Sequence, residues 1–179
     1  LICLSLFHDR QTIALPTPTF HFYTKFDQTG WLHFKKLPCQ GEKDFIRQFN
    51  RVKRARIHGW YIANPNNPLG YGLPVNTLRS AVAAAAKQKI IVIVDEAYYE
   101  FFGQTLAPRL HEFNNLLIVR TFSKAFGLAG VRVGYIITNP RWTKFLEAQR
   151  GPQLICSRTA IDLMQNLKRQ IPRMRRQVQ

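Results

Sequence analysis

Continuous runs of β-branched residues restrict the fold of this chain more than any other feature. "IIVIV" at residues 90–94 has no polar member, so a strand formed there has to be buried on both faces. "LLIV" at 116–119 and "VGYIIT" at 133–138 are further strand-like runs. Residues 75–88 carry a helical pattern rich in alanine. Strands that alternate with helices predict a layered α/β domain around a mainly parallel sheet.

The other expected elements rest on shorter patterns. Residues 1–8 indicate the end of a buried helix rather than a signal peptide. The tail after Ile171 is rich in arginine and lacks apolar periodicity, so we expect it to fray. Further strands are expected at 12–15, 31–37 and 58–63, and further helices at 20–29, at 42–50, around Trp142, Phe145 and Leu146, and around Ala160, Leu163, Met164 and Leu167.

Composition restricts the class of protein. The 179 residues are 46% hydrophobic, which is typical of one globular domain, and no apolar stretch approaches the ~20 residues of a membrane span. The net charge of +16 concentrates in residues 43–60 and 166–179. Such clusters can bind nucleic acid, but no zinc finger, RNP-like motif or basic zipper accompanies them, so we expect a solvated basic surface. Three scattered cysteines favour a reducing, cytoplasmic setting and no metal site.

Polar side chains follow the expected strands. In open α/β sheets, ligands bind beyond the carboxyl ends of the parallel strands. Each of these residues alone could serve a cap, a turn or an exposed surface. Together they predict a binding site. They are Asn67 after the strand at 58–63, Asp95 and Tyr98 after the strand at 90–94, Thr121, Ser123 and Lys124 after the strand at 116–119, and Arg132 at the start of the strand at 133–138.

These residue types suit one cofactor. A lysine amine can form a Schiff base with a carbonyl group. A carboxylate can pair with a protonated pyridine nitrogen. A hydroxyl and a guanidinium can hold a phosphate, and an amide or a phenol can bond a ring hydroxyl. The set therefore predicts pyridoxal 5′-phosphate (PLP) as the cofactor.

Three segments resemble a known family. "ANPNNPLG", "IVIVDEAYYEF" and "LLIVRTFSKAFGLAGVRVGYIITNP" resemble the class I/II (fold type I) PLP-dependent aminotransferases, most closely the histidinol-phosphate aminotransferase branch. The resemblance implies a three-layer α/β sandwich with a mainly parallel mixed sheet, the large domain of that fold. Residues 1–150 would be its core without the amino-terminal part, and 151–179 would begin the connection toward a small carboxy-terminal domain. The chain is expected to be a fragment, since the family's glycine-rich turn and its carboxylate-binding arginine have no counterpart in it.

The resemblance also implies roles for single residues. Lys124 would form the internal aldimine and later act as general acid and base in the proton shift. Asp95 would pair with the pyridine nitrogen, and Asn67 and Tyr98 would bond the phenolic oxygen.

The remaining implied contacts concern the phosphate and the ring face. Thr121, Ser123 and Arg132 would contact the phosphate. Phe20, in "PTPTF", would stack on the ring where the branch usually has tyrosine. In the separate segment "NPNNPLG", Leu69 replaces the more usual threonine, a change that we expect to be tolerated.

The expected function is transfer of an amino group between an amino acid, or a phosphate such as histidinol phosphate, and a 2-oxo acid. The full-length form would be a homodimer. A PLP-dependent decarboxylase of a phosphorylated amino acid is the alternative within the same fold. A non-catalytic remnant that binds PLP weakly and a basic nucleic-acid-binding fragment are alternatives of other classes.

Overall fold

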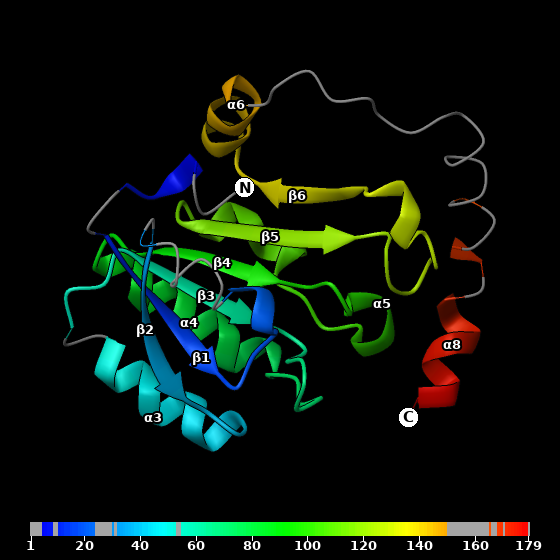
Figure 1. The fold of residues 1–179 in the computed structure, drawn as a ribbon, viewed down its shortest axis with the longest axis horizontal. Helices are drawn as coiled ribbons and strands as arrows, with labels where there is room; N and C mark the ends of the chain where they lie inside the picture. Colours follow the sequence, from blue (N-terminus) through cyan, green and yellow to red (C-terminus); the bar gives the residue numbers. More distant parts are fainter. Residues whose placement is uncertain are drawn as a thin grey trace.

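The described part of the chain is built around one twisted sheet. The computed structural model describes residues 5–8, 11–23, 30, 32–52, 55–149, 165, 168–169 and 171–178. Its six-stranded sheet has the order β2-β1-β3-β4-β5-β6 (Figure 1). The strands are β1 (Thr12–Thr17), β2 (His33–Pro38), β3 (Gly59–Ala63), β4 (Ile91–Asp95), β5 (Leu116–Thr121) and β6 (Gly134–Thr138).

Five of the strands run parallel, and β6 pairs with β5 in the antiparallel direction. The mainly parallel mixed sheet expected from the sequence is therefore confirmed. The register pairs Ala63 with Asp95, and Asp95 with Val119. The carboxyl ends of β3, β4 and β5 consequently meet at one edge of the sheet.

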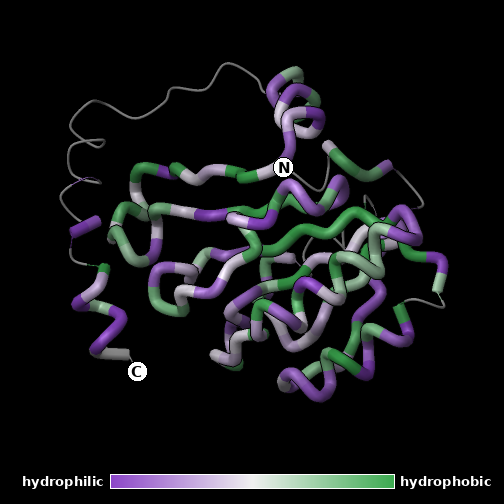
Figure 2. Tube along the Cα trace, turned by 180° about the vertical axis from the view of Figure 1, so that it is seen from behind, coloured by the Kyte–Doolittle hydropathy of each residue, from purple (hydrophilic) through white to green (hydrophobic). Residues whose placement is uncertain are grey.

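Helices cover both faces of the sheet and give it three layers. Helices α3 (Glu42–Val52) and α4 (Val75–Lys87) pack on one face, where Phe45 and Leu78 join a buried cluster around Trp60. Helix α6 (Pro140–Ala148) contributes Trp142 and Leu146 to the cluster on the other face. Figure 2 shows the hydrophobic residues concentrated along the central strands. Among the described helices, none is both long enough and apolar enough to cross a membrane.

The observed elements refine several expectations. Strands β4 and β5 run further than expected, so Asp95 and Thr121 are the last residues of their strands. The sequence did not predict the short helix α5 (Tyr99–Phe102) or the 3-10 helices Ala107–Glu112 and Ala129–Val131. The helix expected around Ala160, Leu163, Met164 and Leu167 lies outside the described residues, as do Trp31 and residues 24–29.

The expectation that the tail frays is wrong. Residues Ile171–Val178 form helix α8, which packs on α5 (Figure 1). The Arg175 guanidinium lies 5.4 Å from the centroid of the Tyr99 ring, and its Nε donates to the Glu100 carbonyl at 2.6 Å. Ile171 and Met174, one helical turn apart, are half-buried, so the segment has a short apolar face that the sequence interpretation overlooked beside its four arginine and glutamine neighbours.

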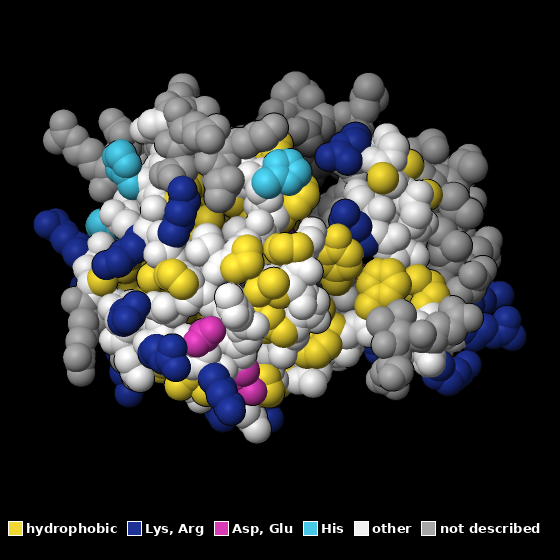
Figure 3. Space-filling model, turned by 60° about the horizontal axis from the view of Figure 1, so that its bottom comes forward, with side chains coloured by type: hydrophobic (Ala, Val, Ile, Leu, Met, Phe, Trp, Pro, Cys, Tyr) yellow, Lys and Arg dark blue, Asp and Glu magenta, His cyan; other side chains and the backbone are white. Residues whose placement is uncertain are grey.

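The basic charge is spread over the surface. Figure 3 shows Lys and Arg side chains scattered over one face, separated by uncharged and hydrophobic surface, with few acidic side chains between them. Many of the acidic side chains instead make specific bonds. Asp44 pairs with Arg47, and Glu112 pairs with both Arg79 and Arg109.

A buried ion pair joins the ends of β4 and β5. Glu96, directly after β4, is fully buried, and its Oε2 accepts from Arg120 Nη2 at 2.8 Å and from Arg120 Nε at 2.9 Å. Thr105 donates to the same oxygen at 2.9 Å, and Arg120 lies 3.5 Å from the Tyr99 ring centroid. Removing one partner would leave the other charge buried without compensation, which is far costlier than losing an exposed pair.

A second buried carboxylate has weaker compensation. Glu100, in α5, is only 4% exposed, and its Oε2 has no hydrogen-bond partner in the described structure. Burial raises the pKa of Glu100 above its ordinary value of 4.5, while Arg120 and Arg175 oppose that rise. The ionised form of Glu100 therefore costs folding free energy, because the folded state holds the proton more tightly than the unfolded state does.

We predict that Arg120→Ala lowers the free energy of unfolding by about 3–5 kcal/mol, because Glu96 is left as an uncompensated buried charge. The matched control is Arg79→Ala, which removes an exposed pair with Glu112 and is expected to change the free energy of unfolding far less. Urea unfolding of both variants measures the difference. Equal losses would show that the buried pair has no special role.

We predict that Glu100→Gln raises the free energy of unfolding at pH 8 by about 1–2 kcal/mol. A raised folded-state pKa makes the penalty absent below about pH 4.5 and present above the folded-state pKa. The gain over the parent chain should therefore shrink as the pH falls toward 4.

The control for this experiment is Glu112→Gln. Hydrogen bonds from Arg79, then from Arg109, hold the pKa of Glu112 below its ordinary value, so its neutralisation should lower stability at pH 8. Denaturant unfolding from pH 4 to 8 gives both signs. A Glu100→Gln difference that does not vary with pH would contradict the prediction.

Candidate functional site

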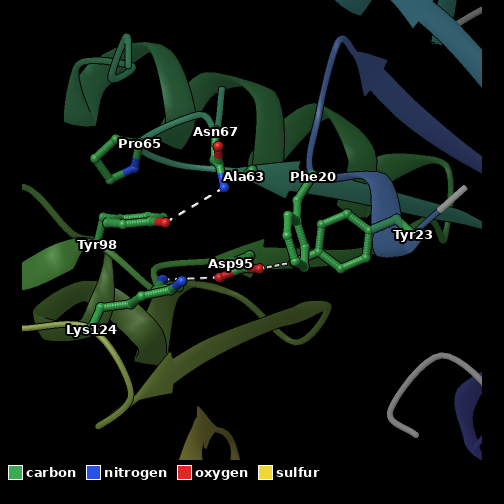
Figure 4. Close-up of a pocket in the computed structure, with 9 residues that line it drawn as sticks. Phe20, Tyr23, Ala63, Pro65, Asn67, Asp95, Tyr98 and Lys124 are labelled. Carbon is green, nitrogen blue, oxygen red and sulfur yellow. Dashed lines mark hydrogen bonds between the residues drawn. The ribbon is translucent and has the colours of Figure 1, made fainter. Parts of the chain in front are cut away.

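A pocket lies at the carboxyl ends of β3, β4 and β5. Figure 4 shows the side chains that line it pointing inward from the strand ends and from the loops that follow them. Five of the eight predicted site residues belong to its lining, and Thr121, Ser123 and Arg132 do not. The lining consists of Phe20, Tyr23, Ala63, Pro65, Asn67, Asp95, Ala97, Tyr98 and Lys124.

Asp95 is the most firmly held side chain of the pocket. It is the last residue of β4, so the sheet register fixes its backbone. Its Oδ1 accepts from the Ala97 amide at 2.9 Å. Its Oδ2 accepts from the Tyr61 hydroxyl at 2.9 Å and also from the Tyr23 hydroxyl. These three donors fix the direction in which the carboxylate faces the pocket.

The loop "NPNNPLG" presents one of its three asparagines to the pocket. Asn64 accepts from the Leu73 amide at 2.7 Å, and Asn66 accepts from Leu69 at 3.1 Å. Both are buried and hold the loop together. Asn67 instead lines the pocket, where its Nδ2 lies 3.5 Å from the Tyr98 hydroxyl. The polar ends of Asn67 and Tyr98 are therefore neighbours on one wall.

Lys124 reaches the pocket from the turn after β5. Its Nζ lies 5.3 Å from the Tyr98 ring centroid, and no described carboxylate forms an ion pair with it. Figure 4 shows Lys124 and Asp95 on the same side of the pocket, opposite Asn67. The pocket thus combines an amine, a carboxylate, an amide and a phenol.

The three remaining predicted residues lie at the end of β5 and in the connection between β5 and β6. The Thr121 and Ser123 hydroxyls are 3.0 Å apart, and Thr121 Oγ1 also accepts from the Ser123 amide at 3.1 Å. Arg132 has a left-handed backbone (φ 56°) between a 3-10 helix and β6, and its Nη1 donates to the Ala129 carbonyl at 3.1 Å. The structure therefore brings Thr121 and Ser123 together but turns the Arg132 guanidinium back onto its own loop.

Aromatic residues form one side of the pocket. The Phe20 ring is 38% exposed and meets the Tyr23 ring edge to face at 5.9 Å between centroids. The Tyr23 ring in turn lies 4.4 Å from that of Tyr61. An exposed apolar ring beside polar groups offers a flat surface for an aromatic ligand.

Sequence reasoning missed Tyr23 and Tyr61, the two tyrosines that bond Asp95. A signal for Tyr61 was present. Tyr61 pairs with Ile93 in the register, and Asp95 is two residues beyond Ile93, so Tyr61 and Asp95 face the same side of the sheet. Tyr23 follows Phe20 by one helical turn, and its amide donates to the Phe20 carbonyl at 3.2 Å. Neither pattern identifies a bond to Asp95 without the fold.

Comparison with known proteins shows the family to which the chain belongs. Residues 1–178 match the family described as aminotransferase class I and II. The chain is 33% identical over 175 residues to the histidinol-phosphate aminotransferase of Thermoanaerobacter sp. (strain X514), an alignment that covers 94% of this chain and 48% of that protein. The chain thus spans about half the length of the curated relatives that it matches.

Solved structures show the same fold. The histidinol-phosphate aminotransferase from Clostridium acetobutylicum aligns with a TM-score of 0.69 at 25% identity, over 86% of this chain and 46% of that one. The L-threonine-O-3-phosphate decarboxylase from Porphyromonas gingivalis aligns with a TM-score of 0.72 at 21% identity, over 94% of this chain and 51% of that one. The second likeness concerns the fold alone. On the match over residues 1–178, the chain belongs to the aminotransferase class I and II family.

Proposed function

We propose that this chain supplies the cofactor-binding centre of a PLP-dependent aminotransferase. One observation carries the proposal: Lys124, Asp95, Asn67 and Tyr98 line a single pocket at the carboxyl ends of adjacent parallel strands. Family membership supports this reaction class, and the residue types in the pocket suit it. The proposed substrates are an amino acid, or a phosphate such as histidinol phosphate, and a 2-oxo acid.

The chemistry of the lining fits PLP. A carbonyl group needs an amine within reach, which Lys124 offers. A pyridine nitrogen needs a carboxylate, which Asp95 offers, and a phenolic oxygen needs donors such as Asn67 and Tyr98. Phe20 would lie against the ring face. When bound, PLP supplies an electron sink that stabilises negative charge at the substrate carbon.

The chain's own residues have separate tasks in this proposal. Lys124 would hold the carbonyl group of PLP and would serve as the group that takes a proton from the substrate and returns it. Asp95 would orient the ring and favour the protonated ring nitrogen. Thr121 and Ser123 would contact the phosphate, and Arg132 would join them once its guanidinium leaves the Ala129 carbonyl.

Similarity to known proteins favours amino transfer over the alternative reaction, decarboxylation. The 33% identity to a histidinol-phosphate aminotransferase favours amino transfer over decarboxylation, since the decarboxylase likeness concerns only the fold. Because the chain spans about half of its relatives, we propose that 1–150 forms the core of the large domain and that 151–179 leads toward a small domain. A homodimeric whole protein in the cytoplasm belongs to the same proposal.

We predict that borohydride reduction of the PLP-treated chain places most of the pyridoxyl label on Lys124, because this amine lies among the groups that would hold the ring. Peptide mapping by mass spectrometry locates the label. The Lys124→Ala variant should lose it, whereas Lys144→Ala, which changes an exposed lysine of α6, should not. Labelling spread evenly over surface lysines would refute the assignment.

We predict that Asp95→Asn slows transamination on the order of a hundredfold, because a neutral amide cannot stabilise a protonated ring nitrogen. The assay uses this chain joined to the additional segments that its relatives carry. Asp44→Asn, a change at a partly exposed residue of α3 outside the pocket lining, is the control and should leave the rate unchanged. A near-normal rate in Asp95→Asn would remove Asp95 from the proposed centre.

A further inference from the structure

Three oxygen atoms from distant parts of the chain meet beside the pocket. The Tyr61 hydroxyl lies 2.9 Å from Asp95 Oδ2 and 2.9 Å from the Tyr23 hydroxyl. The Tyr23 hydroxyl also donates to Asp95 Oδ2. The three residues come from β3, β4 and the segment after β1, so their meeting is a property of the fold and not of local sequence.

Tyr61 is the fixed member of this group. It is 7% exposed and belongs to the buried cluster that also contains Ile13, Leu15 and Ile93. A buried phenol needs a partner for its hydroxyl, and the Asp95 carboxylate provides one. Because both residues lie on neighbouring strands of one sheet, their bond holds the carboxylate in one orientation.

Tyr23 connects Asp95 to the aromatic side of the pocket. It lies one turn beyond Phe20, to which it is joined by the backbone hydrogen bond at 3.2 Å and by the ring contact at 5.9 Å. Phe20 and Tyr23 both line the pocket. The bond from Tyr23 to Asp95 therefore also sets where the Phe20 ring stands.

The donors leave a defined part of the carboxylate for a ligand. An ionised carboxylate offers about four acceptor positions. Ala97, Tyr61 and Tyr23 use three of them. A further donor, such as a protonated ring nitrogen, is thereby directed to the position that the three do not occupy.

We propose that Tyr61 and Tyr23 are positioning residues that act through Asp95. Tyr61 orients the carboxylate, and Tyr23 ties the segment that carries Phe20 to the same carboxylate, so that the edge and the face of a bound ring are set together. The consequence for a bound ring rests on the proposed function, whereas the tie between Tyr23 and Asp95 does not.

The first test needs no cofactor. Tyr23→Phe keeps the ring and removes the hydroxyl. A hydrogen bond to a charged group is worth about 1.5–3 kcal/mol, so its loss should raise local opening, and with it backbone amide exchange of residues 19–23, at least about tenfold. Hydrogen-exchange mass spectrometry of the 179-residue chain measures it.

The control variant is Tyr71→Phe. It removes another half-buried phenol hydroxyl, one that lies 3.2 Å from Cys39 Sγ and outside the pocket lining. Exchange of residues 19–23 should stay unchanged in this variant. Unchanged exchange in Tyr23→Phe as well would overturn the tie, whatever the chain does with PLP.

The second test uses PLP titrated into the same chain. Tyr61→Phe and Tyr23→Phe should each raise the dissociation constant about tenfold, and Tyr61→Phe should also shift the absorbance band of bound PLP, because the carboxylate that faces the ring nitrogen is released. Tyr71→Phe should change neither quantity.

The outcomes separate this inference from the proposed function. If the parent chain binds PLP and the two pocket variants bind it equally well with the same spectrum, the positioning role is wrong and the proposed function stands. If the parent chain binds no PLP while Tyr23→Phe alone raises exchange, the tie stands and the proposed function is contradicted.

Discussion

The register of β3, β4 and β5 is the constraint on which the rest of the structure depends. It places Ala63, Asp95 and Val119 side by side, so the loops that leave these strands start from one edge. Asn67, Tyr98 and Lys124 then reach a common pocket over short distances of chain. A shift of one residue in any strand would send its side chains to the opposite face and disperse the group.

The buried ion pair between Glu96 and Arg120 lies next to the carboxyl ends of β4 and β5. Glu96 follows Asp95 in the chain, and Arg120 precedes Thr121, so the pair joins the two strand ends that carry the carboxylate and the lysine turn. A pair so deeply buried contributes little net stability compared with an apolar replacement. It does make any other alignment of β4 and β5 costly, since a misaligned register would separate two buried charges.

Much of this arrangement could be predicted from the sequence. The runs at 90–94 and 116–119 and the alternation with helices were sufficient for the layered sheet, and the rule for strand ends located Asn67, Asp95 and Lys124. The sequence did not predict two kinds of feature. Helix α8 contacts α5 through Arg175 and the Tyr99 ring, and a contact between such distant segments has no local sequence signal. The bonds of Tyr23 and Tyr61 to Asp95 join segments far apart in sequence, and only the strand order brings them together.

The pocket divides into a part built on strands and a part built on loops, and the division matches the tasks in the proposed function. Asp95 and Tyr61 lie on adjacent strands, where a charge that must meet one ring atom is held with little freedom. Lys124 lies in the bend after β5, and loops tolerate larger displacements than strands do. In the proposed function, the Lys124 amine would have to serve both the carbonyl group of the cofactor and the substrate, so it would need more than one position. A carboxylate on a strand and an amine on a loop therefore suit the separate tasks that we propose for Asp95 and Lys124.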